Sequence, residues 1–436
     1  MEANAKDLHR MSLLSRKSSY DLSAAPEESR NRAILALSRI LEESFEEIRL
    51  ANLEDLRSAE EDHLFSPLLH RLVFDEKKLK QVSDGLRALA ALPDPLGKTT
   101  YAMEITEGLS VYRVVCPIGV VGVIFESRPD ALIQIASLCI KSGNAVLLKG
   151  GREALRTNRI LCSCVRRALS EAALPPDSAQ LLESREDVAS MLKEDALIDL
   201  IIPRGSRQFV RYIMDNSRIP VLGHSDGICH VYIDEFADPT LAVKVTVDSK
   251  TQNVSVCNAA ETILVHEKIA PGVLPPLFES LKKAGVEIRG DEEVQKIVPC
   301  APARAEDWET EYLDYIVSVK IVSSLSDAVD HINTFGSHHT DCICTACEEN
   351  AAAFMQRVDS AGVYWNVSTR FADGFVYGFG AEVGIATGKI HARGPMGLEG
   401  LTTYKYKLIG SGHTMAEMKS GARAYTHKPL RDSCPL

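Results

Sequence analysis

The stretch Ala145-Val146-Leu147-Leu148-Lys149-Gly150-Gly151-Arg152 decides the fold class that we expect for this chain of 436 residues. Its four apolar residues predict a short buried strand, and its two glycines predict a tight turn. A helix is expected before it, from Pro129 to about Lys141 and closed by Gly143, and another after it over 153–172. A strand between two such helices is typical of a parallel sheet.

The alternation of strands and helices continues beyond this stretch. We expect strands over 180–182 and 198–202 and helices over 186–194 and 205–216. Parallel crossovers of this kind predict an α/β fold with a doubly wound sheet covered on both faces. Such sheets bind ligands beyond the carboxyl ends of their strands.

Two glycine turns stand at those strand ends, and both carry a basic residue. Glycine lets the backbone approach a ligand, and the start of a helix offers N–H groups to a phosphate. A plain turn with a solvated cation remains the alternative for either turn alone, but two turns at successive crossovers favour a nucleotide site. A G-x-G-x-x-G fingerprint is absent. The cofactor-binding candidates in these turns are Lys149, Gly150, Gly151, Arg204, Gly205 and Ser206.

The flanking segments complete the expected organisation. One amphipathic helix is predicted over 27–57, and a β-rich pair over 109–116 and 119–125. The second half of the chain reads as another α/β unit, followed from about residue 360 by glycine-dense loops that are typical of a ligand site. Its expected elements are strands at 229–233, 261–266 and 341–345 and helices near 268–284 and 325–334.

Cys257 is the candidate nucleophile. It lies among small and polar residues in a predicted loop that leads into the strand-like run Ile263-Leu264-Val265. A thiol that attacks a carbonyl carbon must be exposed to its substrate and must reach the thiolate form. The alternative is that Cys257 is a buried small apolar residue, which is the common role of a single cysteine.

Composition excludes several classes of protein. The net charge of −11 argues against nucleic acid or an anionic membrane as the main partner. Eleven cysteines without regular spacing suit a reducing compartment. No uninterrupted apolar segment is long enough to span a bilayer, and no secretory signal is evident, so we expect a cytoplasmic protein.

Four motifs of the chain are specific, namely Pro117–Pro129, Lys141–Ala145, Trp365–Phe371 and His391–Leu398. They resemble those of the γ-glutamyl phosphate reductases, a branch of the aldehyde dehydrogenase superfamily. The resemblance covers about residues 5–406 and implies an aldehyde-dehydrogenase-like fold in three parts. These are an NADP-binding domain at 1–99 and 118–228, a catalytic domain at 229–400 that carries Cys257, and a small β oligomerisation element at 100–117 and 401–436.

The resemblance also implies a reaction. NADPH would reduce L-glutamyl 5-phosphate to L-glutamate 5-semialdehyde and phosphate through a thioester on Cys257, the second step of proline synthesis. Lys149 falls where the superfamily binds the cofactor ribose, Gly205-Ser206 resembles its pyrophosphate contact, and Glu311 is a candidate for its second ribose ligand. Val221 replaces the Glu that activates water in hydrolytic members, which argues against the alternative of an oxidising aldehyde dehydrogenase of another substrate class.

The implied substrate carries a phosphate and an α-carboxylate, so we expect arginines to converge on it. Which arginine meets which anion stays open, and internal pairing with acids is the alternative role. The superfamily has a Pro-Trp-Asn element whose Asn donates to the oxyanion, and the corresponding stretch here, Glu126-Ser127-Arg128, is one residue shorter. The identity of the oxyanion donor therefore stays open, and the backbone N–H of Cys257 is available for this role. The substrate-binding candidates are Arg128, Asn366, Ser368, Arg370, Asp373 and Arg393.

Partners and rival functions complete the expectations. We expect a homodimer, and a transient contact with a separate glutamate 5-kinase because acyl phosphates are labile. A non-catalytic scaffold is the rival of a different class. Cys342-x-Cys344-x-x-Cys347, with His338 and His339 upstream, suggests zinc, but the alternation reads as a half-buried strand and we expect no metal.

Overall fold

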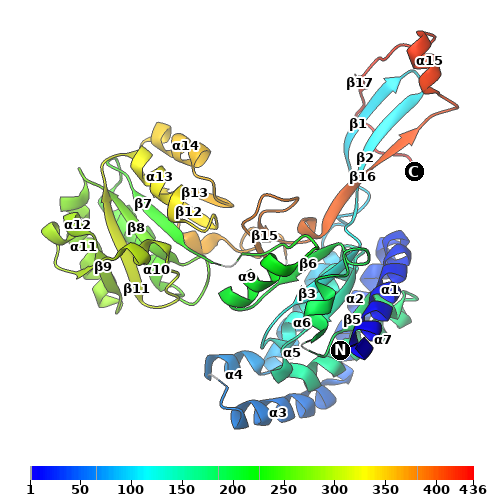
Figure 1. Cartoon of the computed structure of the whole chain (residues 1–436), viewed down its shortest axis with the longest axis horizontal. Helices are drawn as coiled ribbons and strands as arrows, with labels where there is room; N and C mark the ends of the chain where they lie inside the picture. Colours follow the sequence, from blue (N-terminus) through cyan, green and yellow to red (C-terminus); the bar gives the residue numbers. More distant parts are fainter. Residues whose placement is uncertain (1, 65, 185, 225, 381) are drawn as a thin grey trace. The chain divides into compact units, whose positions relative to one another are not determined.

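The computed structural model describes residues 2–64, 66–184, 186–224, 226–380 and 382–436 (Figure 1). The chain forms two compact units. The first contains residues 1–205, 212–221 and 396–436, and the second contains residues 206–211 and 222–395. The three-part division expected from the sequence stays a prediction.

The first unit is built on a four-stranded parallel sheet with the order β5-β4-β3-β6. From β3 the chain moves to β4 and β5 on one side and returns to β6 on the other, so β3 is the point where the strand order reverses. Every residue of β3, β4 and β6 is buried, as expected for a sheet covered on both faces. The strands are β3 (Val120–Ile124), β4 (Ala145–Lys149), β5 (Ala179–Leu181) and β6 (Leu200–Pro203). The helices between them are α6 (Pro129–Lys141), α7 (Leu155–Glu171) and α8 (Glu186–Met191). The helix α9 (Arg207–Asn216) follows β6, and its residues 207–211 are grouped with the second unit.

The N-terminal helices correct one prediction. The single helix expected over 27–57 is two helices that meet at Ser44, whose backbone leaves the helical region at φ −94° and ψ 6°. Apolar residues keep their helical spacing across the break, and Leu41 and Ile48 are both buried, so periodicity did not reveal it. The helices are α1 (Glu2–Ala24), α2 (Glu27–Glu43), α3 (Phe45–Glu61), α4 (Ser66–Leu72) and α5 (Glu76–Ala91).

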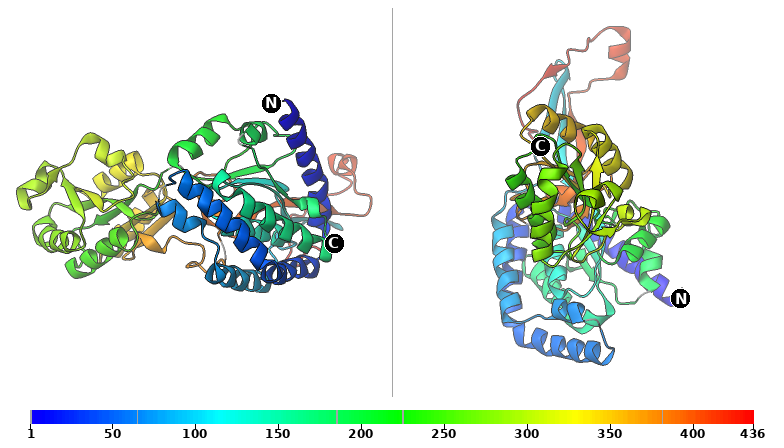
Figure 2. Two further views of the ribbon diagram at one scale, coloured as in Figure 1. Left: turned by 90° about the horizontal axis from the view of Figure 1, so that it is seen from below. Right: turned by 90° about the vertical axis from the view of Figure 1, so that its left-hand side faces the viewer.

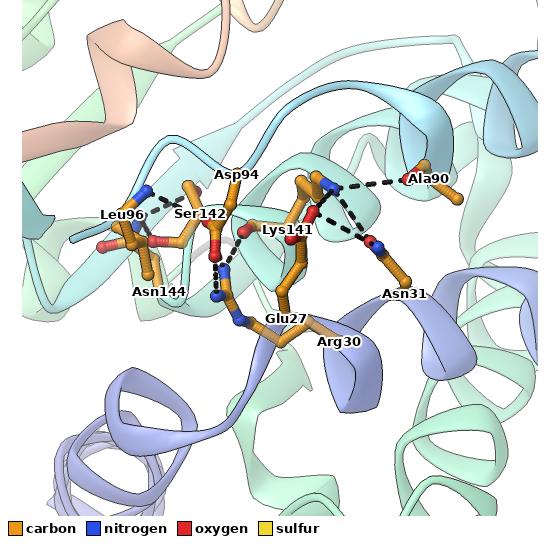
Figure 3. Close-up of polar contacts among 9 residues, drawn as sticks. All are labelled: Glu27, Arg30, Asn31, Ala90, Asp94, Leu96, Lys141, Ser142 and Asn144. Carbon is orange, nitrogen blue, oxygen red and sulfur yellow. Dashed lines mark hydrogen bonds and ion pairs between the residues drawn. The ribbon is translucent and has the colours of Figure 1, made fainter. Parts of the chain in front are cut away.

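Lys141, at the end of α6, is fully buried and joins three helices (Figure 3). Its ammonium group donates to Glu27 and Asn31 of α2, each at 2.9 Å, and to the carbonyl of Ala90 in α5 at 3.3 Å. Arg30 donates to the Lys141 carbonyl. A buried ammonium is costly unless all its donors are used, and here each of the three has a partner.

Asn144, three residues later, has a similar role in the same motif. Its carbonyl oxygen accepts from Gly119 N at 2.8 Å, and its amide nitrogen donates to Leu401 O at 2.8 Å and to Ser142 Oγ at 2.9 Å. These bonds fasten the start of β4 to two chain segments that lead to the antiparallel sheet. The motif at 141–145 therefore serves packing in this structure.

The first unit also contains a four-stranded antiparallel sheet with the order β16-β2-β1-β17. Strands from the segments 100–117 and 401–436 therefore pair with each other in this sheet. Alternate residues of β16 expose Tyr404, Tyr406 and Leu408 on one face. The elements are β1 (Thr99–Thr106), β2 (Leu109–Pro117), β16 (Thr402–Ile409), α15 (Met415–Ser420) and β17 (Lys428–Pro429).

The second unit is a seven-stranded parallel sheet with the order β10-β9-β11-β8-β7-β12-β13. Val231 and Ile233 pack with α10, α11 and α12 on one face, and Tyr232 packs with α13 and α14 on the other (Figures 1 and 2). Its seven strands are β7 (Cys229–Ile233), β8 (Ala260–His266), β9 (Glu287–Gly290), β10 (Ala301–Pro302), β11 (Ile316–Val322), β12 (Thr340–Cys344) and β13 (Gly362–Trp365). A separate two-stranded sheet is formed by β14 (Gly384–Ala386) and β15 (Gly394–Met396). The helices are α10 (Pro239–Thr251), α11 (Ala270–Lys283), α12 (Glu292–Ile297), α13 (Leu325–Phe335) and α14 (Glu348–Arg357).

Among the described residues, no helix combines the length and the apolar character needed to cross a membrane.

Candidate active site

Cys257 lies in the loop between α10 and β8, and backbone contacts fix this loop on several sides. The Cys257 carbonyl accepts from the thiol of Cys229 at 3.2 Å. The next residue, Asn258, donates from its side chain to Ala372 O at 2.9 Å and accepts at its carbonyl from the Thr369 hydroxyl at 2.7 Å. The nucleophile candidate is therefore held in one position before any substrate arrives.

Gly227 lies directly against the backbone of Cys257. A Cβ atom at this position would be 2.2 Å from the Cys257 carbonyl oxygen and 2.4 Å from its Cα. Gly227 N in turn donates to Glu311 Oε1 at 2.9 Å. Only glycine fits here, because the neighbouring atoms belong to backbone that cannot rotate away.

The sulfur of Cys257 contacts a histidine. Its Sγ lies 3.1 Å from His339 Nε2, and His339 Nδ1 lies 3.0 Å from Thr340 Oγ1. A second histidine, His224, meets His339 edge to face with the ring centroids 5.0 Å apart, and its Nδ1 donates to Ile385 O at 2.9 Å. The strands of this sheet are parallel, and all of these residues except Ile385 lie before or at the start of one. They therefore meet at the edge formed by the amino ends of the strands.

Electrostatics keep both members of the Cys257–His339 pair neutral. Burial raises the pKa of the Cys257 thiol to about 12, with the negative charges of Glu311 and Glu382 adding to the rise and Arg370 opposing it. Burial lowers the pKa of His339 well below its usual value, and the neighbouring His224 lowers it further. A neutral thiol is a poor nucleophile, so it must lose its proton as it attacks, and a neutral imidazole in contact can accept that proton.

A buried ion pair spans the base of the nucleophile loop. Lys250 at the end of α10 donates to Glu261 at the start of β8 across 2.6 Å, and both side chains are 0% exposed. The other carboxylate oxygen of Glu261 accepts from Leu313 N at 3.3 Å. Burial raises the pKa of Glu261 to about 7, although the attraction of Lys250 opposes the rise. The pair closes the two ends of the loop that carries Cys257.

Three comparisons relate the chain to known proteins. Residues 1–314 match the model of the aldehyde dehydrogenase family. The chain is 58% identical to the gamma-glutamyl phosphate reductase of Acetivibrio thermocellus, over 97% of this chain and 98% of that protein, and 55% identical to that of Pelotomaculum thermopropionicum over the same shares. The crystal structure of gamma-glutamyl phosphate reductase from Thermotoga maritima is 40% identical, has a TM-score of 0.92, and covers 93% of this chain and 99% of that one.

The chain belongs to the gamma-glutamyl phosphate reductases of the aldehyde dehydrogenase family. It is therefore an oxidoreductase, and the resemblance and the fold class predicted from the sequence are confirmed. Aldehyde dehydrogenases use NAD or NADP, so the chain uses a nicotinamide cofactor.

Two of the predicted substrate residues lie near the nucleophile loop. Arg370 Nε donates to Gln252 Oε1, in that loop, at 2.8 Å, and the charge of Arg370 acts on the Cys257 sulfur. Ser368 is buried and accepts from Ser249 Oγ at 3.2 Å. Arg370 is thus the predicted arginine for which the structure records an electrostatic effect on the thiol.

The other predicted substrate residues are engaged in holding loops. Asn366 bonds the backbone of Thr345 through both ends of its amide, at 2.8 and 2.9 Å. Asp373 accepts from two backbone N–H groups of the following turn. Arg393 forms an ion pair with Asp359 at 3.0 Å, and both side chains are partly exposed. Arg128, in the first unit, pairs with Asp130 at 3.3 Å. Their roles in binding stay predictions.

The cofactor candidates of the first unit gather at one edge of its sheet. Lys149 ends β4 and Arg204 follows β6, and these strands flank the carboxyl end of β3. Gly205 follows in the first unit, whereas Ser206 is grouped with the second. Lys149 donates to Gly150 O at 2.6 Å, and burial lowers the pKa of its ammonium.

This edge fits a nucleotide on two observations. A Cβ at Gly150 would lie 2.2 Å from Asn158 Nδ2, and one at Gly151 would lie 2.0 Å from Glu153 Oε1, so the turn presents bare backbone. Asn158 is buried, and neither polar atom of its amide has a partner among the residues that the structure describes. A buried amide without partners is unusual, and a polar ligand at this turn would relieve it.

Sequence reasoning missed three residues of the site. His339 drew attention only as a neighbour of Cys342 and Cys344, and these two cysteines lie on β12, all of whose residues are buried rather than half-buried. His224 and Gly227 were not singled out. The two histidines meet Cys257 only through the order of strands in the sheet, which no local pattern encodes. The one local signal for Gly227 was its position two residues before a buried strand.

Proposed function

We propose that the chain reduces L-glutamyl 5-phosphate with NADPH to L-glutamate 5-semialdehyde and phosphate, the second step of proline synthesis, through a thioester on Cys257. The observation that carries the mechanism is the 3.1 Å contact between Cys257 Sγ and His339 Nε2 on a fixed loop. A nucleophile with a base in hydrogen-bond reach is the arrangement that acyl transfer requires.

In the first half-reaction the Cys257 sulfur attacks the acyl carbon. The S–H proton passes to His339 Nε2 as the carbon–sulfur bond forms, and the bond from carbon to the phosphate oxygen breaks. The departing phosphate takes the proton from His339, so the imidazole is neutral again. The backbone N–H of Cys257 is our proposed donor to the carbonyl oxygen, whose negative charge grows as the sulfur adds.

In the second half-reaction the thioester becomes an aldehyde. NADPH, when bound, supplies the hydride. The carbon–sulfur bond then breaks, the aldehyde leaves, and Cys257 departs as a thiolate. His339 delivers a proton from solvent to that thiolate, so one proton is consumed in each turnover. The low pKa of His339 favours this delivery, because a weakly basic imidazole gives up its proton readily. The same low pKa makes His339 a weak base in the first half-reaction, so the thiol proton leaves only as the carbon–sulfur bond forms.

Arg370 is our candidate for one of the two anionic groups of the substrate. The charge of Arg370 lowers the pKa of the Cys257 thiol, whereas Arg393 is paired with Asp359. Arg128, Asn366, Ser368, Asp373 and Arg393 remain proposed substrate contacts. Lys149, Gly150, Gly151, Arg204, Gly205, Ser206 and Glu311 remain proposed cofactor contacts. In this structure Glu311 already uses one oxygen to hold Gly227.

The reverse reaction tests this proposal. Glutamate semialdehyde, in equilibrium with its cyclic form, should reduce NADP only when inorganic phosphate is present, because phosphate releases the acyl group. NADP reduction that continues at the same rate without phosphate would mean that water resolves the thioester. The chain would then be an ordinary oxidising aldehyde dehydrogenase.

Four further properties belong to the same proposal. NADPH rather than NADH is the expected reductant. A homodimer is favoured by the exposed residues of β16, and a separate glutamate 5-kinase is the proposed source of the labile acyl phosphate. A cytoplasmic location is favoured because all eleven cysteines are unbridged, as in reducing compartments.

A further inference from the structure

We propose that Cys257, His339 and His224 form a site for Zn²⁺, and that the occupied site is inactive because the ion takes the nucleophilic sulfur. One ligand atom from each of the three residues lies within 4.8 Å of those of the other two. Among the residues that the structure describes, this is the one group of three or more potential metal ligands found so close together. The inactivation, though not the binding, rests on the proposed function of Cys257.

The spacing needs only a small adjustment to hold an ion. Zinc binds sulfur at about 2.3 Å and imidazole nitrogen at about 2.0–2.1 Å, so two ligand atoms on a tetrahedral ion are roughly 3.3–3.6 Å apart. Cys257 Sγ and His339 Nε2 are already 3.1 Å apart. The ligand atom of His224 lies within 4.8 Å of the other two, so it needs to move inward by at most roughly 1.5 Å to reach the spacing of a tetrahedral site.

In both histidines the hydrogen bond made by Nδ1 orients the ring so that Nε2 is the nitrogen suited to bind a metal. His224 Nδ1 bonds the carbonyl of Ile385, which can only accept, so Nδ1 carries the proton and Nε2 carries the lone pair. His339 uses Nδ1 toward the Thr340 hydroxyl and presents Nε2 to the sulfur. Metal-binding histidines usually have one ring nitrogen fixed in this way, because it orients the ring and sets the tautomer.

The ligand types indicate which ion binds. One thiolate and two imidazoles suit zinc better than magnesium or calcium, which prefer oxygen. Three protein ligands also leave a fourth position for water, as in zinc sites that are not purely structural. The carboxylates of Glu311 and Glu382 act on the sulfur electrostatically and therefore favour a cation beside it. Cys257 and His224 are only partly buried, so the ion has a way in.

Binding changes the chemistry of the sulfur without any redox step. The S–H bond breaks, a zinc–sulfur bond forms, and the proton goes to solvent. The sulfur lone pair that would attack the acyl carbon is then shared with the metal. Removal of the ion by a chelator reverses each of these changes.

Cobalt titration of the reduced full-length protein tests the site without substrate. Co²⁺ should give the sulfur-to-metal charge-transfer band of a thiolate site in wild type, and Cys257→Ala should abolish it. His224→Asn should weaken cobalt binding by at least about tenfold, since loss of even an outer partner typically costs 10–100-fold. Cys347→Ser is the matched control and should bind cobalt like wild type, since Cys347 lies outside the cluster. A band that persists in Cys257→Ala, or unchanged affinity in His224→Asn, would overturn the site.

Zinc inhibition tests the consequence. Zn²⁺ should stop turnover at the concentration that displaces Co²⁺, and a chelator should restore it in full. Undiminished turnover with the site filled would overturn the inactive state. A protein that binds cobalt as described but fails the phosphate-dependent reaction would count against the proposed function and leave the metal site standing.

Discussion

Cys257 is held as a neutral thiol. The protein therefore provides a proton acceptor, His339, instead of keeping the cysteine permanently ionised. Burial and the charges of Glu311 and Glu382 raise the pKa of the thiol to about 12, so thiolate is scarce at neutral pH. A permanently ionised cysteine would be open to oxidation and alkylation between turnovers. Coupling deprotonation to attack through His339 avoids that exposure.

Replacing His339 tests this coupling. His339→Asn should lower kcat by about 10²–10⁴-fold, the usual contribution of a positioned acid–base group, and leave NADPH affinity near that of wild type. The deficit should shrink as the pH rises, because hydroxide then removes the thiol proton without a base. Rates measured across pH check both points. A kcat within twofold of wild type at every pH would contradict the role of His339.

Gly227 is the second test at the scale of the residue. Gly227→Ala should displace the Cys257 backbone and lower kcat sharply, because the added carbon would lie 2.2 Å from a backbone oxygen. Gly272→Ala is the matched control. Gly272 lies in α11 with nothing within 4 Å of its would-be Cβ, so this change should keep activity and stabilise the fold by about 0.5–1 kcal/mol. Turnover assays and thermal unfolding measure both effects, and equal kcat in the two variants would contradict the packing argument.

At the scale of elements, Lys250 and Glu261 join α10 to β8 under the nucleophile loop. Removing one charge leaves the other buried and alone, so Lys250→Met should lower the free energy of unfolding by about 3–5 kcal/mol. Replacing both by methionine should recover most of that loss, since an apolar pair of similar volume often replaces a buried ion pair without cost.

The Lys250→Met variant should also change the pH dependence of stability. Burial holds the pKa of Glu261 at about 7 even with Lys250 present, and loss of that attraction must raise it further. A carboxyl group whose folded pKa lies above its unfolded value stabilises the protein below the unfolded pKa and loses that contribution as the pH rises through the folded pKa. In the wild type, the loss of stability caused by ionisation of Glu261 should end near pH 7. In the Lys250→Met variant, this loss should continue to higher pH. Parallel stability curves on the alkaline side would contradict this.

Most elements were predictable from the sequence, and the site was predictable only in part. Strands such as 229–233 and helices such as 129–141 agree with the prediction because apolar spacing and Pro/Gly boundaries are local signals. The break at Ser44 was missed because the apolar spacing continues through it. His339 was missed as a partner of Cys257 because 82 residues separate them and only the sheet order brings them together.

At the scale of the whole molecule, the antiparallel sheet carries the prediction of oligomerisation. β16 exposes Tyr406 and Leu408 at 57% and 59%, and exposed apolar residues on a strand commonly pair with a second copy. Tyr406→Lys combined with Leu408→Lys should convert the proposed dimer to monomer. Leu50→Lys, on α3 and 52% exposed, is the control and should leave the assembly unchanged. Light scattering measures the mass, and an unchanged mass in the double variant would contradict this role of β16.

The most direct test of the central claim is a phosphate-free burst. Enzyme is mixed rapidly with glutamate semialdehyde and excess NADP in the absence of phosphate. A fast burst of NADPH should form, equal in amount to the enzyme subunits, because Cys257 becomes acylated and the thioester accumulates. Added phosphate should then start steady turnover, and Cys257→Ala should show neither phase. A burst of wild-type size in Cys257→Ala, or steady turnover of wild type without phosphate, would contradict a thioester on Cys257 that phosphate resolves.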